Sequence, residues 1–207
     1  MIDWSNLNVN HLDTLKEIAN IGAGNAVTSL SKLIGKPIKM RVPTAEMVEF
    51  SRIADFLGGP EQIVVGILVQ ITGDINGMMM FIVRREHASV LISALLQHFC
   101  DGMTGDERDT MEMSAMEEIG NILSSSYLGS LSSIINKKAV PSIPFLSIDM
   151  ANAILSVPAI EFGRVANHAL LIESVFETQD NDDVSGYFLL IPDSQSLAII
   201  LESLGAK

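Results

Sequence analysis

Two helical segments of the sequence carry a glutamate and an asparagine at the same spacing. Glu17 is followed by Asn20, and 101 residues later Glu118 is followed by Asn121. Residues three apart lie on one face of an α-helix, so each pair would point a carboxylate and a carboxamide in the same direction. An amide has no usable pKa and cannot act as a general base, but it can orient a water molecule by donating and accepting hydrogen bonds. The two asparagines are therefore candidates for positioning a water.

Each pair belongs to a longer pattern with identical spacing in both copies. Three residues separate its first two members, two separate glutamate from asparagine, and 22 precede a proline. A single Glu-x-x-Asn is usually part of a solvated helix face, and Glu17 could simply pair with Lys16 or another neighbour. Ordinary residue frequencies produce the four-residue pattern roughly once in 10⁵ starting positions, so two copies favour a function. The copies are Asp13, Glu17, Asn20 and Pro43, and Ser114, Glu118, Asn121 and Pro144.

The chain also repeats itself beyond this pattern. A shift of 101 residues aligns 13–43 with 114–144 without a gap, and ten of the 31 positions are identical. Residues 77–96 resemble residues 186–205 in the same way. A period near 100 residues indicates a duplicated unit of domain size rather than a solenoid. We expect one domain over residues 1–207, with repeat halves 1–102 and 103–207.

Hydrophobic periodicity gives each half the order helix, strands, helix. Apolar residues recur at helical spacing in the long first helices, and turn residues separate the strands. This order is typical of an α+β fold, in which we expect two pseudo-symmetric halves to share a mostly antiparallel sheet with the long helices packed on it. The expected helices are 10–35, 86–98, 108–136 and 193–205, and the strands are 63–72, 75–84, 168–178 and 184–192, with an extended segment through residue 43 and a connection at 102–107.

Composition narrows the classes of function. The formal net charge of −12 argues against a nucleic-acid partner, because such binding depends on clustered Lys and Arg. The single cysteine, Cys100, excludes a disulfide framework within the chain, and the four histidines are too scattered to predict a metal site. The start of the sequence does not read as a signal peptide, and the apolar runs are too short to span a bilayer. We expect a soluble cytoplasmic protein with no membrane insertion.

The four-residue pattern resembles the signature of the CheC-type chemotaxis phosphatases. This family includes CheC, CheX and the phosphatase core of the flagellar-switch protein FliY, and its signature is Asp/Ser-x3-Glu-x2-Asn-x22-Pro. Both copies fit without departure, and the resemblance covers nearly the whole chain, including the duplicated α+β layout. Two intact copies in 207 residues most resemble the CheC branch, since CheX is shorter and usually carries one such site.

The resemblance implies hydrolysis of the aspartyl phosphate of a chemotaxis response regulator, phosphorylated CheY. Asn20 and Asn121 would orient the attacking water, the part that a glutamine plays in small GTPases. An acyl phosphate is already reactive, so positioning alone can be sufficient. No cofactor is expected on this chain, because the regulator supplies its own Mg²⁺ and a lysine. Glu17 and Glu118 would hold that lysine and so fix the docking register.

For the neighbouring positions the sequence leaves alternatives open. Asp13 and Ser114 either bond to nearby backbone or partner groups, or merely face solvent. Small residues at 22–24 and 124–126 keep one helical turn thin beside each Glu–Asn pair. A thin turn either admits the close approach of another backbone or allows tight packing inside the protein itself.

A rival interpretation is a non-catalytic adaptor that binds the regulator or a chemotaxis or flagellar component through the same helices. The resemblance also implies a second partner, the receptor deamidase CheD, which would dock away from those helices. We expect its docking segment at 147–155, read as a helix with Asp149 near the N-terminus, where the dipole favours an anion. Met150, Ala153 and Ile154 would form its apolar stripe, which would equally suit a surface helix packed on the sheet.

Overall fold

The computed structural model describes residues 8–35, 37–42, 44–96, 105–162, 168–177 and 183–204. Six helices and eight strands lie in these ranges, and in each half of the sequence the order is long helix, two short strands, helix, two long strands, helix. The helices are α1 (Val9–Ile34), α2 (Phe50–Phe56), α3 (Arg85–Leu96), α4 (Gly105–Ile135), α5 (Ala151–Phe162) and α6 (Ser194–Ser203). The strands are β1 (Lys39–Arg41), β2 (Ala45–Glu49), β3 (Ile63–Gly73), β4 (Gly77–Arg84), β5 (Ala139–Pro141), β6 (Phe145–Met150), β7 (His168–Glu177) and β8 (Val184–Pro192).

The ends of α1 follow from local sequence signals. Asn8 caps the helix by accepting a hydrogen bond from the His11 backbone N–H at 3.0 Å, and the His11 ring nitrogen Nδ1 accepts one from the Asn8 N–H at 3.1 Å. These two bonds satisfy backbone donors that the first helical turn would otherwise leave unpaired. The helix ends at Gly35, whose φ of 71° is left-handed and is easily adopted only by glycine.

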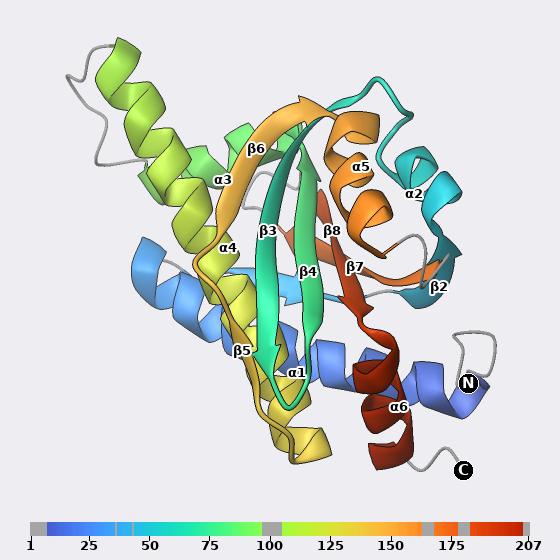
Figure 1. Cartoon of the computed structure of the whole chain (residues 1–207). Coiled ribbons are helices and arrows are strands. Elements are labelled where there is room, and N and C mark those ends of the chain that lie inside the picture. Colours follow the sequence, from blue (N-terminus) through green and yellow to red (C-terminus); the bar gives the residue numbers. More distant parts are fainter. Residues whose placement is uncertain are drawn as a thin grey trace.

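A single antiparallel sheet joins the two halves of the chain, as Figure 1 shows. Its order is β1-β7-β8-β4-β3-β5, with β2 also paired to β7 and β6 also paired to β3. The short strands of each half therefore pair with the long hairpin of the other half. At the centre, β4 pairs with β8 so that Met80 lies opposite Leu189, and these two residues occupy equivalent positions in the sequence repeat. The pseudo-two-fold axis that the sequence predicted passes through this pair.

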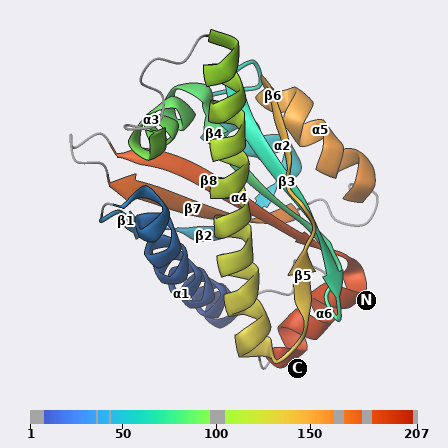
Figure 2. The same cartoon turned by 90° about the vertical axis from the view of Figure 1, so that its left-hand side faces the viewer.

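Helices cover both faces of the sheet, so the molecule has three layers (Figures 1 and 2). Side chains on neighbouring strand positions alternate between the faces. On β4, Met79 and Phe81 belong to the larger core beneath α1 and α4, to which α3 and α6 also contribute. Met80 and Ile82 point the other way, into the smaller core beneath α2 and α5. The α+β class and the antiparallel sheet that the sequence predicted are confirmed.

Three sequence-based expectations about local structure were wrong. Helix α2 was not expected, because its seven residues are too few to show a clear helical period. The proposed connection 102–107 is too long, since α4 already begins at Gly105. The expected helix 147–155 is divided: its first four residues finish strand β6, and α5 begins only at Ala151. Pairing of β6 with β3 decides this, and such long-range pairing is invisible to local periodicity.

A buried tyrosine of α4 fixes this helix to the sheet. The Tyr127 hydroxyl lies 2.8 Å from Ser174 Oγ on β7, and its ring packs on Phe188 of β8 with centroids 4.4 Å apart. Burial raises the pKa of Tyr127 to about 12, and the hydrogen bond with Ser174 partly offsets this rise. The phenol is therefore neutral in the folded protein under all ordinary conditions.

Replacing this tyrosine should change how stability depends on pH. Below pH 10 the Tyr127–Ser174 bond contributes in full, and Tyr127→Phe should cost about 1–2 kcal/mol because Ser174 Oγ loses its partner. Between pH 10 and 12 the unfolded chain releases the phenolic proton while the folded chain keeps it, so wild-type stability should fall with rising pH by about 2–3 kcal/mol. Urea denaturation at several pH values should show the gap between wild type and Tyr127→Phe closing over this window. Tyr187→Phe is the control, since that half-exposed phenol should leave the Tyr127 contribution in place. A gap that stays constant with pH would contradict the assignment.

Candidate functional site

The first Glu–Asn pair lies on the outer face of α1. Leu15, Ile18 and Ala19 are buried in the core. The side chains of Glu17 and Asn20, which lie on the other side of the helix, are exposed. The helical period of 3.6 residues thus separates a packing face from an accessible face that carries the candidate chemistry.

The second pair repeats this arrangement on α4. Glu118 and Asn121 are exposed, while Ile119 and Leu123 are buried beneath the helix. Helix α4 lies so close to the sheet that position 120 requires a glycine. A Cβ atom on Gly120 would come within 2.5 Å of the Ile67 side chain on β3. Packing of α4 on the sheet therefore turns its Glu–Asn face towards solvent.

None of the candidate side chains is engaged within the part of the chain that the structure describes. Glu17, Asn20, Glu118 and Asn121 make no side-chain hydrogen bond or ion pair with any described residue, and Glu17 does not pair with Lys16. Asp13 and Ser114 are likewise exposed and form no bond to the nearby described backbone. The carboxylates and carboxamides are thus available to a partner from outside.

Of the two prolines in the pattern, the structure describes only Pro144. Pro144 stands half-buried between β5 and β6, just before the edge strand that pairs with β3. Pro43 falls outside the described residues. Pro144 therefore lies at a junction between two strands, where the backbone N–H that proline lacks is not needed for pairing.

The two long helices cross with their backbones close together, as Figure 2 shows from the side of α4. A Cβ atom on Gly22 would lie 3.0 Å from Tyr127 Cα, so this glycine permits the crossing. Asn25 Nδ2 donates to Ser130 Oγ at 3.2 Å across the same contact. Of the two explanations for the small residues, internal packing holds for Gly22 and for the buried Ala23. Gly24 is different, because a Cβ atom there would meet nothing within 4 Å.

Asp149, the expected docking residue for a second partner, is exposed on strand β6. The Asp149 Oδ1 atom accepts a hydrogen bond from the Met150 backbone N–H at 2.7 Å. Asp149 comes two residues before the start of α5. The expected apolar stripe is split by the true element boundary. Ile154 is buried against the sheet, whereas Met150 is 44% exposed.

Sequence reasoning missed a cleft between α3, α4 and β6, with a volume of about 210 Å³. Met113 and Met116 line it from α4, and Arg85 lies at the opposite wall. Met113 comes five positions before Glu118, and Met116 comes five positions before Asn121. At 100° per residue, five positions turn a side chain roughly 140° around the helix axis. The cleft therefore opens on a different side of α4 and does not contain the candidate pair.

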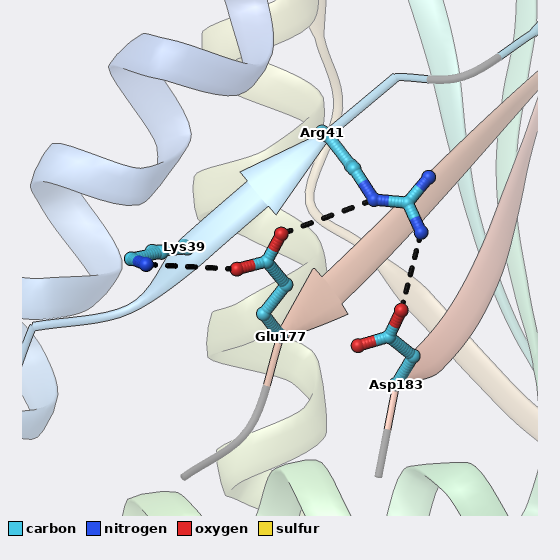
Figure 3. A network of polar contacts seen from close by, with 4 residues as sticks. All are labelled: Lys39, Arg41, Glu177 and Asp183. Atoms are coloured by element: carbon cyan, nitrogen blue, oxygen red, sulfur yellow. Dashed lines mark hydrogen bonds and ion pairs between the residues drawn. The ribbon is translucent and has the colours of Figure 1, made fainter. Parts of the chain in front are cut away.

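Sequence reasoning also missed a network of charges at the end of β7, which Figure 3 shows. Glu177 forms ion pairs with Lys39 Nζ at 3.8 Å and with Arg41 Nε at 3.9 Å, and Arg41 Nη2 donates a hydrogen bond to Asp183 Oδ2 at 3.1 Å. The network joins β1 of the first half to the β7–β8 hairpin of the second. All four side chains are substantially exposed, so each pair contributes only about 0–1 kcal/mol. Its residues come from β1, β7 and the position just before β8 rather than from α1 and α4, which carry the Glu–Asn pairs.

Metal-binding clusters and membrane-spanning helices are both absent from the described part of the chain. No group of three or more histidine, cysteine, aspartate or glutamate side chains is arranged there to hold a metal ion. Among the helices of the described ranges, none combines the length and apolar character needed to cross a bilayer.

Comparison with known proteins identifies relatives over most of the chain. The model of the "CheC-like family" matches residues 11–47 and 111–148, the two segments that carry the repeated pattern. The CheY-P phosphatase CheC of Bacillus subtilis is 32% identical over 197 residues, which are 95% of this chain and 94% of that protein. The flagellar motor switch phosphatase FliY of the same bacterium is 27% identical over 133 residues, covering 64% of this chain and 34% of FliY.

Solved structures show that the fold is shared. The crystal structure of FliY from Thermotoga maritima matches with a TM-score of 0.74 at 20% identity, covering 97% of this chain and 99% of that one. The chemotaxis protein CheX from Desulfovibrio desulfuricans matches with a TM-score of 0.52 at 18% identity, covering 84% of this chain and 99% of CheX. Because the family model matches both repeated segments and the identity to CheC extends over nearly the whole chain, this chain belongs to the CheC-like family.

Proposed function

We propose that this protein is a phosphatase that hydrolyses the aspartyl phosphate of the response regulator CheY. The proposal is supported by its relatives, since the CheC of Bacillus subtilis that is 32% identical over nearly the whole chain is a CheY-P phosphatase. The observation in the structure that carries it is the accessible, unengaged state of a Glu–Asn pair on each long helix. No bond to a described residue has to break before a partner can contact either pair.

In the proposed reaction, water attacks the phosphorus atom in line with the bond to the aspartate of CheY. That P–O bond breaks, the aspartate leaves as a carboxylate, and the proton of the water is carried away on inorganic phosphate. Asn20 or Asn121 would hold the water through its carboxamide, which can accept a hydrogen bond from the water and donate one to it or to a phosphoryl oxygen. The contribution of this protein is positioning, since the acyl phosphate is already a reactive bond.

The glutamates have a different part in the proposal. A carboxylate beside a phosphoryl group repels an anion, so Glu17 and Glu118 are poorly suited to the attacking step. They are well suited to pair with a lysine of CheY through a charge-assisted hydrogen bond, which would fix the register in which the two proteins meet. Mg²⁺ is assigned to CheY in this proposal, and this chain would contribute no ligand to it.

The test is a single-turnover measurement of phosphorylated CheY with and without the purified protein. Loss of radiolabelled phosphate from CheY should be accelerated many-fold when the protein is present in excess. Binding of CheY without any acceleration of decay would instead support a non-catalytic adaptor and would contradict the enzymatic proposal.

We also propose the receptor deamidase CheD as a second partner, docking at strand β6 and helix α5. Asp149 is exposed there beside Met150, and Ile63, which lies opposite Met150 in the sheet, is 43% exposed. Val157 and Ile160 of α5 are also exposed, at 46% and 76%. An apolar area with a charged residue at its border is typical of a protein-binding surface. By strand alternation, Asp149 faces the α5 side of the sheet, as its partner Val64 does, whereas Met150 and Ile63 face the α4 side at the same edge.

Reversing the charge of Asp149 should therefore weaken CheD binding. Asp149→Lys is expected to reduce co-elution with CheD by tenfold or more, because a charge at the border of an interface guides and orients docking. Glu202→Lys, a charge reversal at an exposed position of α6 outside the proposed docking surface, is the matched control and should have a smaller effect. Pull-down with purified CheD measures both, and undiminished co-elution of the Asp149 variant would remove this surface from consideration.

A further inference from the structure

Gly24 is a helical glycine for which the packing of the described residues gives no reason. It lies in the interior of α1 with an ordinary helical backbone rather than a positive φ. A Cβ atom built on it would meet no atom within 4 Å. Gly22 shows the contrast, because its Cβ would come within 3.0 Å of Tyr127 Cα. Glycine is among the least favourable residues in a helix interior, so Gly24 lowers the stability of α1 without an internal benefit.

The position of Gly24 relates it directly to the first Glu–Asn pair. It follows Glu17 by seven residues and Asn20 by four, so all three lie on one exposed strip of the helix. The rise of 1.5 Å per residue places Gly24 about 6 Å along the axis from Asn20. On α4 the equivalent residue after Asn121 is Ser125, which is also small and exposed. On both helices, the exposed strip that carries the Glu–Asn pair (the Glu–Asn row) therefore continues into a low patch, where the next side chain is small or absent.

A short carboxamide needs such a low patch if it is to reach into another protein. The asparagine side chain extends only two carbon atoms from the backbone, so Asn20 can contact a recessed group only when the partner comes close to α1 itself. A long side chain one turn away would project as far as the carboxamide and hold the partner off. A glycine at this position removes even the methyl group that alanine would present.

We infer that Gly24 is a positioning residue, on which the main chain of phosphorylated CheY packs so that Asn20 reaches the phosphoryl group. This inference rests on the proposed function. It also distinguishes the two sites, because Ser125 offers the partner a hydroxyl group where Gly24 offers bare backbone. The site on α1 should accept the closer approach and tolerate added bulk less well.

The test measures one site at a time in the full-length protein. In an Asn121→Ala background, where only the α1 site is active, Gly24→Ala should lower the acceleration of CheY-P decay about threefold, and Gly24→Leu should lower it at least tenfold. The loss should appear mainly as a higher KM or weaker binding of CheY carrying beryllofluoride, a stable phosphoryl mimic. Asp55→Leu, which adds the same exposed side chain to α2 on the opposite face of the sheet, is the control and should remain within twofold of its parent.

Thermal unfolding separates docking from a structural effect. Gly24→Ala should raise the melting temperature by roughly 2–4 °C, because alanine favours the helix. Gly129→Ala, at another exposed helical glycine with open space around it, should raise it by a similar amount. A variant that is more stable yet slower supports the inference. Gly24→Leu with the decay rate of its parent would overturn the inference, as would an inactive Asn121→Ala parent when the wild type is active. A wild-type protein that accelerates no decay would overturn the proposed function itself.

Discussion

The double variant Asn20→Ala/Asn121→Ala should lose the acceleration of CheY-P decay by about 100-fold or more, falling towards the spontaneous rate. Each asparagine is assigned the task of holding the attacking water, and alanine can neither donate nor accept the hydrogen bonds that this requires. Loss of precise positioning alone can cost a factor of this size. The measurement is single-turnover decay of phosphorylated CheY with the variant in excess.

The single variants make this experiment more informative. Asn20→Ala and Asn121→Ala should each retain the activity of the remaining site, so their rates report how the work is divided between α1 and α4. Both asparagines are exposed, so the fold and the melting temperature should be unchanged. Binding of CheY should also survive, since docking is assigned to other side chains. Wild-type decay rates in the double variant would exclude the proposed mechanism.

The charge reversal Glu17→Lys/Glu118→Lys should weaken the binding of CheY by at least tenfold, which corresponds to about 1.4 kcal/mol. Each new ammonium group would face the lysine of CheY that the glutamate is proposed to hold, and like charges across an interface are strongly unfavourable. Calorimetry with CheY carrying beryllofluoride measures this affinity directly. The defect should shrink at high salt, because these side chains are exposed and their interactions are screened.

A matched control separates the local effect from the change in overall charge. Glu61→Lys/Glu202→Lys alters the net charge by the same amount at two exposed positions away from the Glu–Asn rows. Since the chain carries a formal net charge of −12, any general loss of electrostatic attraction would appear in both double variants. Equal affinities for CheY in the Glu17/Glu118 variant and this control would contradict the docking role.

Local sequence patterns predicted the elements that are long and strongly periodic. Both long helices, the β3–β4 and β7–β8 hairpins and the closing helices lie within a few residues of the predicted ranges. These elements show clear hydrophobic periods of 3.6 or 2 residues, and caps and turns mark their ends. The end of α1 at Gly35 is one example. The repeat boundary expected at residues 102 and 103 lies outside the described residues and stays a prediction.

Short elements and edge strands could not be predicted in the same way. Strand β6 and helix α5 share a stretch of apolar residues, and only the pairing of Ile148 with Val65 and its neighbours decides where the strand stops. Helix α2 is stabilised by burial of Ile53 and Leu57 in the smaller core rather than by its own length. A helix of seven residues has little stability alone, so its sequence carries a weak signal.

For the candidate site, the sequence by itself determined which side chains repeat and that Glu17 and Asn20 share a helix face, because spacing along a helix sets direction. Only the tertiary structure decided which face is covered. Gly22 and Gly24 are the same residue type, two positions apart in α1. Gly22 lies against Tyr127 of the crossing helix, whereas Gly24 faces open space. Likewise, the exchange of short strands between the halves depends on contacts between residues far apart in the chain. Burial and long-range pairing are properties of the assembled layers, so no local pattern of residues can specify them.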